Sequence, residues 1–273
     1  MFESVYFYGV TLSLILALFL AVLIGISLGL IGGGGSILTV PVLVYVMQFD
    51  THTATSYSLF IVGVASLVGA VQYAVRKQID MKSWLYFGVP SLITIYLTRS
   101  RLLPMIPQKI SLGAWQISSD VLILILFSLL MIAASVSMIR KTRVKEKPRT
   151  SKKGFLVLQG MSIGLLSGLI GVGGGFLIIP ALIHFSGLDV KRAVGTSLLL
   201  ITTNSLIGFL GDIGAVEIQW NFLLMYTALA VVGIVIGLRV SRFVSNEKLK
   251  PAFGWFILCM GVFILCKELF LKG

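Results

Sequence analysis

The stretch GLIGGGGSILTVP at residues 29–41 returns as GLIGVGGGFLIIP at residues 168–180, at an offset of 139 residues. An ungapped comparison of residues 29–70 with residues 168–209 gives 16 identities in 42 positions. Agreement over this length without a gap indicates an internal duplication. The chain is therefore predicted to consist of two related halves, each with one glycine-rich phrase.

The composition is that of a membrane protein. Hydrophobic residues make up 57% of the chain and charged residues 12%, with a mean hydropathy of +1.02, whereas soluble domains are about 45 to 50% apolar and about 25% charged. The uncharged runs are residues 4–49, 51–75, 83–98, 121–139, 154–188, 193–211, 218–238 and 251–266. A membrane-spanning helix needs about 17 to 25 residues, so most runs qualify singly. The first and fifth runs are too long for one helix and contain the glycine phrases, so each is predicted to hold two helical pieces.

The sequence argues against a cleaved signal peptide, a disulfide or zinc framework, and binding of nucleic acid or nucleotides. The apolar N-terminus is much longer than a signal-peptide core and is expected to be retained. Cys259 and Cys266 lie two turns apart on one predicted helix and form neither a disulfide framework nor a zinc motif. The net charge of +12 resides in short loops, where it orients a membrane protein rather than binding nucleic acid. Neither glycine phrase has the spacing of a nucleotide-binding loop. We expect no cofactor and no metal.

The distribution of basic residues predicts the topology. Residues 140–153 hold eight basic residues and one acid between the two halves, so this linker is predicted to be cytoplasmic. Counting outward from it, the first half (1–139) begins outside and the second half (154–273) begins inside. The predicted fold is an all-α polytopic membrane protein in one integrated domain. Its two inverted-topology repeats each contain a glycine-broken or re-entrant helix pair and three transmembrane helices.

One stretch does not fit this scheme. Arg99, Arg101 and Lys109 lie on the outer side of the membrane in this topology, whereas basic residues are expected on the cytoplasmic side. Pro104 and Pro107 and a mixed polarity mark the same stretch. We therefore interpret residues 98–118 as a segment lying on the membrane surface.

The glycine phrases predict an anion site. Residues 36–46 and 176–185 are expected to be short helices whose N-terminal ends point into the protein. Such ends offer free N–H groups and a partial positive charge, and glycine allows a ligand close to the backbone. The alternative is that glycine merely lets helices approach each other. We favour that alternative for isolated glycines such as Gly25 and Gly233, and the anion site for the clustered ones.

The matched segments 50–60 and 189–200 supply further candidates. Asp50 and Asp189 stand where helices begin, so they either cap those helices or bind a coupling ion. Hydroxyl groups in the first turns could donate to an anion or bond to their own helix. Asn204, in a polar cluster at residues 202–205 opposite residues 63–66, either joins helices or lines a cavity. The candidate substrate-binding residues are Gly33, Gly34, Gly35, Ser36, Gly173, Gly174, Gly175, Tyr57, Ser58, Thr196, Ser197 and Asn204. The candidates for access or coupling are Asp50, His52, Asp189 and Arg192.

The remaining polar residues carry weaker signals. His52 and His184 stand alone in the sequence, which favours structural roles. Lys191 and Arg192 either orient a loop or raise the local anion concentration. No carboxylate lies deep within any uncharged run, so the sequence argues against a proton relay through buried Asp or Glu.

The duplicated phrase, at residues 32–36 and 171–175, resembles the TauE/SafE sulfite-exporter family. The resemblance covers both halves and the linker. It implies a membrane transporter of sulfur-containing anions, with sulfite, sulfoacetate and related organosulfonates as the usual substrates. The two copies differ, because Ser36 aligns with Gly175 and Gly33 with Val172. The implied site is therefore only pseudo-symmetric.

Taken together, the sequence predicts a carrier in the bacterial inner membrane. It would move small anions such as sulfite or a sulfonate by alternating access, with export as the expected direction. An anion channel that uses the same helix ends is the alternative. An enzyme is disfavoured because the uncharged runs contain no Asp, Glu, Lys or Arg to assemble a catalytic site. A scaffold would have no use for two glycine breaks.

Overall fold

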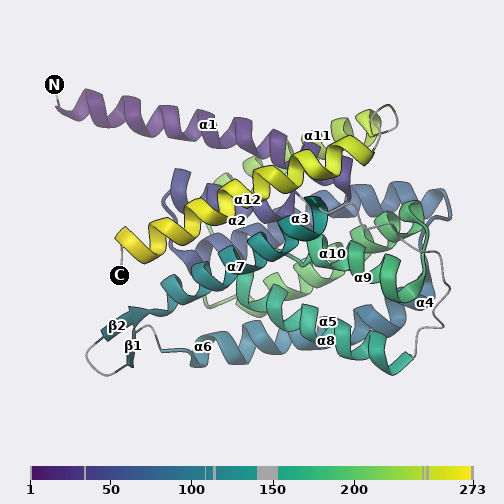
Figure 1. Cartoon of the computed structure of the whole chain (residues 1–273). Helices are drawn as coiled ribbons and strands as arrows, with labels where there is room; N and C mark the ends of the chain where they lie inside the picture. The colour runs from purple at the N-terminus through teal and green to yellow at the C-terminus, as the bar shows by residue number, and fades with distance from the viewer. Residues whose placement is uncertain are drawn as a thin grey trace.

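The computed structural model describes the chain except for residues 1, 34, 108, 113–114, 140–152, 242, 244–245 and 272–273. The described part is helical apart from one short antiparallel hairpin, β1 (Lys109–Leu112) with β2 (Trp115–Ser118). Figure 1 shows helices that run roughly along one direction, with both termini and the hairpin at the same end. The basic linker lies outside the described residues except for Lys153, which begins α8.

The first half contains α-helices and three π-helical segments, each of which directly continues an α-helix. The elements are α1 (Phe2–Ile31), α2 (Ser36–Pro41), η1 (Val42–Val46), α3 (Thr51–Val75), α4 (Met81–Ser83), η2 (Trp84–Gly88), α5 (Val89–Leu97), η3 (Thr98–Leu102), α6 (Leu103–Met105) and α7 (Ser119–Ile139). The second half contains α8 (Lys153–Ile170), α9 (Gly175–Ser186), α10 (Val190–Asp212), α11 (Trp220–Val240) and α12 (Asn246–Leu271).

The polytopic all-α class is confirmed. Within the described ranges, five helices are long and apolar enough to span a membrane, namely α3, α7, α10, α11 and α12. The short helices predicted after the glycine phrases are also present, as α2 with η1 (Ser36–Val46) and as α9.

Both glycine phrases begin with a helix end of the same geometry. The N–H of Gly32 donates to the carbonyl of Leu28, and the N–H of Gly171 donates to that of Ser167, each at 2.8 Å. Gly32 and Gly171 have φ angles of 77° and 76°. Only glycine adopts this left-handed conformation without steric cost, and it ends a helix. The duplicated glycine at the two positions therefore terminates α1 and α8 in the same way.

The long helices pack in four main pairs. α1 lies on α11, α5 on α8, α3 on α10 and α7 on α12. With the 139-residue offset, α1 corresponds to α8 and α11 to α5, so the first two pairs are equivalent. The residue contacts repeat likewise: Gly69 lies against Leu198 and Ile234, and Gly208 lies against Leu59 and Ile95.

Close backbone contacts hold the first of these pairs. A Cβ added at Gly25 would fall on the carbonyl oxygen of Ala230, and one added at Gly233 would lie 3.0 Å from the Cα of Gly25. The packing interpretation of Gly25 and Gly233 is thereby confirmed. Small residues allow such approach in a lipid environment, where van der Waals contact drives helix association.

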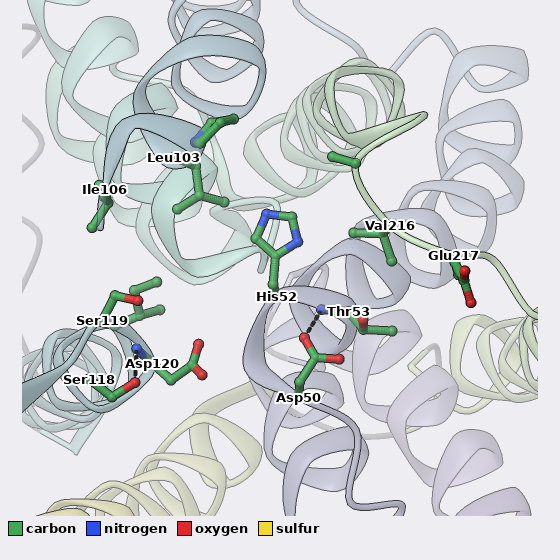
Figure 2. A pocket seen from close by; sticks show the side chains of 13 residues that line it. Asp50, His52, Thr53, Leu103, Ile106, Ser118, Ser119, Asp120, Val216 and Glu217 are labelled. Atoms are coloured by element: carbon green, nitrogen blue, oxygen red, sulfur yellow. Dashed lines mark hydrogen bonds between the residues drawn. The ribbon is translucent and has the colours of Figure 1, made fainter. Parts of the chain in front are cut away.

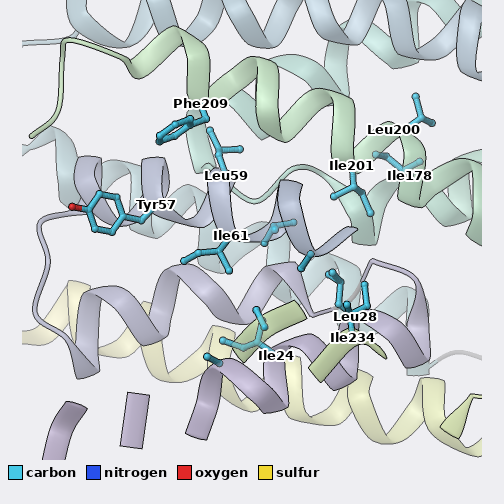
Figure 3. Packing of buried hydrophobic residues seen from close by; sticks show 14 of the residues in the cluster. Ile24, Leu28, Tyr57, Leu59, Ile61, Ile178, Leu200, Ile201, Phe209 and Ile234 are labelled. Atoms are coloured by element: carbon cyan, nitrogen blue, oxygen red, sulfur yellow. The ribbon is translucent and has the colours of Figure 1, made fainter. Parts of the chain in front are cut away.

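The central core lies where α1, α3, α10 and α11 meet. It contains buried Ile24, Leu28, Ile61, Ile201 and Ile234 (Figure 3). A second apolar cluster joins α7 and α12 to α2, which places the first glycine phrase between the two clusters.

The surface interpretation of residues 98–118 is wrong for its beginning. Helical structure continues from Met81 to Met105 without a break, through η2, α5, η3 and α6. Thr98 and Arg99 are buried, with Arg99 only 1% exposed. The helix extends past the end of the uncharged run because Arg99 finds an acidic partner inside the protein.

Candidate functional site

The two glycine phrases meet inside the bundle. A Cβ added at Gly33 would lie 2.7 Å from the carbonyl oxygen of Gly175, and one added at Gly175 would lie 2.8 Å from the Cα of Gly33. Gly175 also contacts Ile201, at the middle of α10. Residues 32, 33, 35 and 36 of the first phrase and residues 171–175 of the second are buried. Two segments separated by 139 residues of sequence are thus in direct backbone contact at the centre of the helices.

Buried hydroxyl groups surround the second phrase. The Oγ atoms of Ser205 and Ser167 lie beside Gly173 and Gly174, so close that a side chain at either glycine would displace them. Neither hydroxyl has a hydrogen-bond partner among the described residues. Buried polar groups normally find partners, and an unpaired one costs about 1 to 3 kcal/mol. These hydroxyls are available to a ligand that carries hydrogen-bond acceptors.

The predicted hydroxyl candidates divide into two groups. Ser58 is buried, and its Oγ has no hydrogen-bond partner in the described part of the chain. Ser197 donates to the carbonyl of Gly32 at 2.9 Å and is within reach of that of Val194, so it fastens the first phrase to α10. Ser36 donates to the carbonyl of Gly33 at 2.8 Å. The hydroxyl groups of Ser36 and Ser197 therefore both form hydrogen bonds with backbone carbonyls of the first phrase.

Two other candidates are engaged elsewhere. The hydroxyl of Thr196 accepts the N–H of Asp80 at 2.9 Å, in the connection before α4. The hydroxyl of Tyr57 accepts the N–H of Gln219 at 2.7 Å, and its ring lies against Phe49 and Phe222. Both side chains thus hold connecting segments in place. Gly34 lies outside the described residues.

Asn204 joins two helices. Its Nδ2 donates to the hydroxyl of Ser91 at 2.8 Å, which links α10 to α5. Its Oδ1 is buried and lacks a partner among the residues described. Asn204 therefore bonds to a neighbouring helix and still offers one polar atom.

The two predicted helix caps differ. Asp50 caps α3, because its Oδ1 accepts the N–H of Thr53 at 2.9 Å. Asp189 occupies the equivalent position before α10, but its side chain makes no capping bond, so that part of the prediction is wrong. Its carboxylate is exposed and lies 3.9 Å from the Nε of Arg192, which is also exposed. An exposed pair of this kind contributes little to stability.

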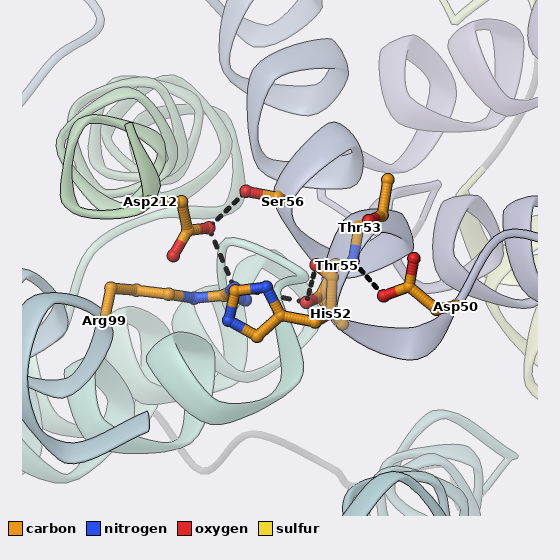
Figure 4. Close-up of polar contacts among 7 residues, drawn as sticks. All are labelled: Asp50, His52, Thr53, Thr55, Ser56, Arg99 and Asp212. Atoms are coloured by element: carbon orange, nitrogen blue, oxygen red, sulfur yellow. Dashed lines mark hydrogen bonds and ion pairs between the residues drawn. The ribbon is translucent and has the colours of Figure 1, made fainter. Parts of the chain in front are cut away.

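A buried charged cluster lies beside the second phrase (Figure 4). Arg99 Nη1 lies 2.9 Å from Asp212 Oδ2, and the two side chains are 0% and 1% exposed. The same Nη1 donates to Thr55 Oγ1 at 3.1 Å, and Ser56 Oγ donates to Asp212 Oδ2. Thr55 in turn donates to the carbonyl of His52. A Cβ added at Gly171 would meet both Thr55 and Arg99.

We call this group, Thr55, Ser56, Arg99 and Asp212, the Arg99 cluster. The sequence did not predict it. Asp212 ends α10 and directly follows the uncharged run 193–211, so the sequence pattern gives no sign that it is buried. The expectation that no carboxylate is deeply placed is therefore wrong, since Asp212 is buried in the fold. A signal was present, because Arg99 follows Ile95 and precedes Leu103 at helical spacing on a buried face.

A pocket of about 690 Å³ opens next to the cluster. Figure 2 shows His52 at its centre, with acidic side chains around it. The lining residues are Asp50, His52, Thr53, Leu103, Pro104, Ile106, Ser118, Ser119, Asp120, Ile123, Ala215, Val216 and Glu217. The predicted access residues Asp50 and His52 line this pocket, whereas Asp189 and Arg192 do not. The side chain of His184 is outside the described part of the structure.

Comparison with known proteins decides the family. The family model described as "Sulfite exporter TauE/SafE" matches residues 17–264, which is most of the chain. The chain belongs to the TauE/SafE family. The resemblance carried by the duplicated glycine phrase is thereby confirmed.

The TauE/SafE chain has curated relatives of similar length. A "Probable membrane transporter protein" of Xylella fastidiosa is 28% identical, covering 90% of this chain and 92% of the relative. A relative of the same description from Methanocaldococcus jannaschii is 26% identical, with coverages of 92% and 96%. One from Bacillus subtilis is 26% identical, with coverages of 84% and 91%. No solved structure matches the chain. This TauE/SafE protein is a multi-pass membrane transporter and not an enzyme.

The TauE/SafE protein contains a second buried carboxylate. Glu268 in α12 is 0% exposed and accepts the hydroxyl of Tyr45 at 2.9 Å. The Nζ of Lys267 lies 4.2 Å from the centre of the Tyr45 ring. These contacts attach the last helix to η1. Sequence reasoning missed Glu268 because it follows the last uncharged run.

Proposed function

We propose that this protein is a carrier that exports small sulfur-containing anions, such as sulfite and sulfonates including sulfoacetate, across a bacterial inner membrane. The family name supports the substrate class. The main structural support is the contact between Gly33 and Gly175 at the middle of α10. Two broken helix pairs converge there, and helix N-termini with close-approach glycines suit an anion.

We also propose that residues 1–139 and 154–273 form inverted-topology repeats joined by a cytoplasmic linker at 140–153. The support is the equivalence of the α1–α11 and α5–α8 pairs under the 139-residue offset. A pseudo-two-fold axis between α3 and α10 accounts for both pairs, and it places the two phrases on opposite sides of one central site.

The proposed mechanism is alternating access. The two phrases are in backbone contact at Gly33 and Gly175, so an anion bound between them would be released when one helix group rotates relative to the other. The substrate-binding set that we propose comprises the glycines of both phrases together with Ser58, Ser167, Ser205 and Asn204. The last four each carry a buried polar atom without a hydrogen-bond partner among the described residues.

Counterflow in proteoliposomes tests the proposal. Vesicles are preloaded with unlabelled sulfoacetate, labelled sulfoacetate is added outside, and protein-free vesicles serve as the control. A carrier gives transient accumulation of label, which sulfite and sulfoacetate suppress and chloride does not. Linear uptake without an overshoot would indicate a channel. Absence of flux for sulfoacetate, sulfite and sulfate would contradict the assigned substrate class.

A further inference from the structure

Arg99 has a free edge inside the protein. Its Nη1 is bonded to Asp212 and Thr55, but Nε and Nη2 are buried and make no hydrogen bond within the described part of the chain. Nε and Nη2 lie on the same side of the planar guanidinium group and donate in parallel. Buried donors without partners are costly, the more so on a charged group. The arrangement leaves both donors of this edge without a partner among the described residues.

The free edge points to the second glycine phrase. A Cβ added at Gly171 would lie 2.6 Å from Arg99 Nη2. A ligand at this edge would therefore lie beside the backbone that leads to Gly173 and Gly174. Two parallel N–H donors match two oxygen atoms of one oxyanion, as in bidentate binding of carboxylate or phosphate. A halide offers only one acceptor centre and gains less from this geometry.

The other half of the protein shows that packing does not need these charges. With the 139-residue offset, Thr55, Arg99 and Asp212 correspond to Val194, Leu238 and Tyr73. The contact of Gly171 with Thr55 is repeated as the contact of Gly32 with Val194. An uncharged set of residues thus occupies the equivalent positions. Since burying a charge is expensive in a membrane protein, the presence of the ion pair in one half alone indicates a function.

The cluster is one helical turn from the pocket described above. His52 precedes Ser56 by four residues in α3, and Leu103 follows Arg99 by four residues. Ala215 follows Asp212 by three residues. The pocket therefore lies one helical turn from the buried guanidinium group. The acidic residues Asp50, Asp120 and Glu217 line this pocket, and the buried Arg99 is the cation that lies one helical turn beyond its lining.

We propose that the Nε–Nη2 edge of Arg99 recognises the oxyanion group of the substrate, and that Asp212, Thr55 and Ser56 position the guanidinium group. This inference rests on the proposed transport of sulfur oxyanions and names the residue that selects them. Asp212 holds Nη1 and leaves the two donors of the opposite edge, Nε and Nη2, for the ligand. Arg99 thereby favours sulfite and sulfonates, which have several oxygens on one sulfur, over chloride.

The test compares Arg99→Lys with the wild type. Lysine keeps the positive charge next to Asp212 but loses the two-donor edge. Calorimetric titration of the purified full-length protein in detergent measures binding of sulfite, sulfoacetate and chloride. We expect Arg99→Lys to bind sulfite and sulfoacetate about 10- to 100-fold more weakly, with a smaller change for chloride. The unfolding temperature of each variant is measured to verify folding.

A second variant provides a test in case Arg99→Lys does not fold. Arg99→Leu combined with Asp212→Asn removes both charges and places at residue 99 the leucine found at residue 238. It is expected to fold and to lose sulfite binding. If the wild type binds sulfite and both variants bind it equally well, the role of Arg99 is refuted while the proposed transport function stands. If the wild type binds no sulfur oxyanion, the proposed function and the inference both fail.

Discussion

Gly171 and Gly214 have similar backbone conformations but different surroundings. Substitutions at the two positions therefore separate the effect of side-chain contacts from the effect of backbone strain. Gly171 and Gly214 have φ angles of 76° and 89°. A Cβ at Gly171 meets Thr55 and Arg99, whereas a Cβ at Gly214 has nothing within 4 Å. Alanine carries the same left-handed strain at both positions, of about 1 to 2 kcal/mol. Only the substitution at Gly171 also disturbs the Arg99 cluster.

Gly171→Ala is therefore expected to abolish most counterflow and to lower stability by about 1 to 3 kcal/mol beyond the strain shared with Gly214→Ala. The measurements are the rate of labelled sulfoacetate counterflow and the thermal unfolding temperature. Gly214→Ala is the matched control and should keep most of its transport. Equal transport by the two variants would show that the contact at Gly171 is unimportant.

The Tyr45–Glu268 bond permits a second prediction for single residues. Tyr45→Phe removes the donor and leaves the buried carboxylate with one bond fewer. We expect a loss of about 1.5 to 3 kcal/mol, the usual value for a hydrogen bond to a charged group. Thermal unfolding of the purified protein measures the loss. Glu268→Gln keeps an acceptor for the hydroxyl and should cost less than Tyr45→Phe, and the reverse order would contradict this account.

Individual residues were predictable only where local chemistry decides their role. Asp50 caps α3 because a short acidic side chain before a helix accepts a free N–H of the first turn. The roles of Arg99 and Asp212 depend on a contact between positions 113 residues apart. The positions of the uncharged runs along the sequence cannot reveal such a contact. The equivalent Asp189 shows the same limit, since it stands at the same position before α10 and yet makes no capping bond.

At the level of elements, hydrophobic runs and glycine breaks predicted most of the helices. The break at Gly32 and Gly171 is local, because left-handed glycine ends a helix whatever surrounds it. The helix that begins at Met81 was predicted to end before Arg99, because that charged residue was taken to mark the membrane boundary, but it continues to Met105. Arg99 extends that helix inward by pairing with Asp212. The β1–β2 hairpin was not predicted either, because its stretch was interpreted as surface-lying.

Glycine contacts between helices lead to a prediction at this level. Gly233 touches α1 at its backbone, so Gly233→Val forces α11 away from α1. Overpacking of this kind costs about 1 to 3 kcal/mol or more. Gly154 in α8 has nothing within 4 Å, so Gly154→Val is a matched control with little expected effect. Thermal unfolding in detergent compares the two variants. Similar unfolding temperatures would mean that α1 and α11 tolerate separation.

At the level of the whole molecule, duplication together with inversion predicts which ends of the helices face each side of the membrane. In the proposed topology, the connection after α10 is outside and the connection between α9 and α10 is inside. Gly214 and Gly187 lie in these two connections. Both have left-handed backbones, with φ angles of 89° and 64°, and neither has a neighbour within 4 Å of an added Cβ. A cysteine therefore meets the same strain at each position.

We expect Gly214→Cys to react with a membrane-impermeant maleimide in intact cells, and Gly187→Cys to react only after permeabilisation. The background protein carries alanine in place of the exposed Cys259 and Cys266. Each single-cysteine protein is also labelled in detergent to show that its thiol is reactive. The opposite pattern would reverse the orientation and place the pocket around His52 on the cytoplasmic side. Labelling of both positions from the same side would contradict a crossing by α10, and with it the inverted repeat.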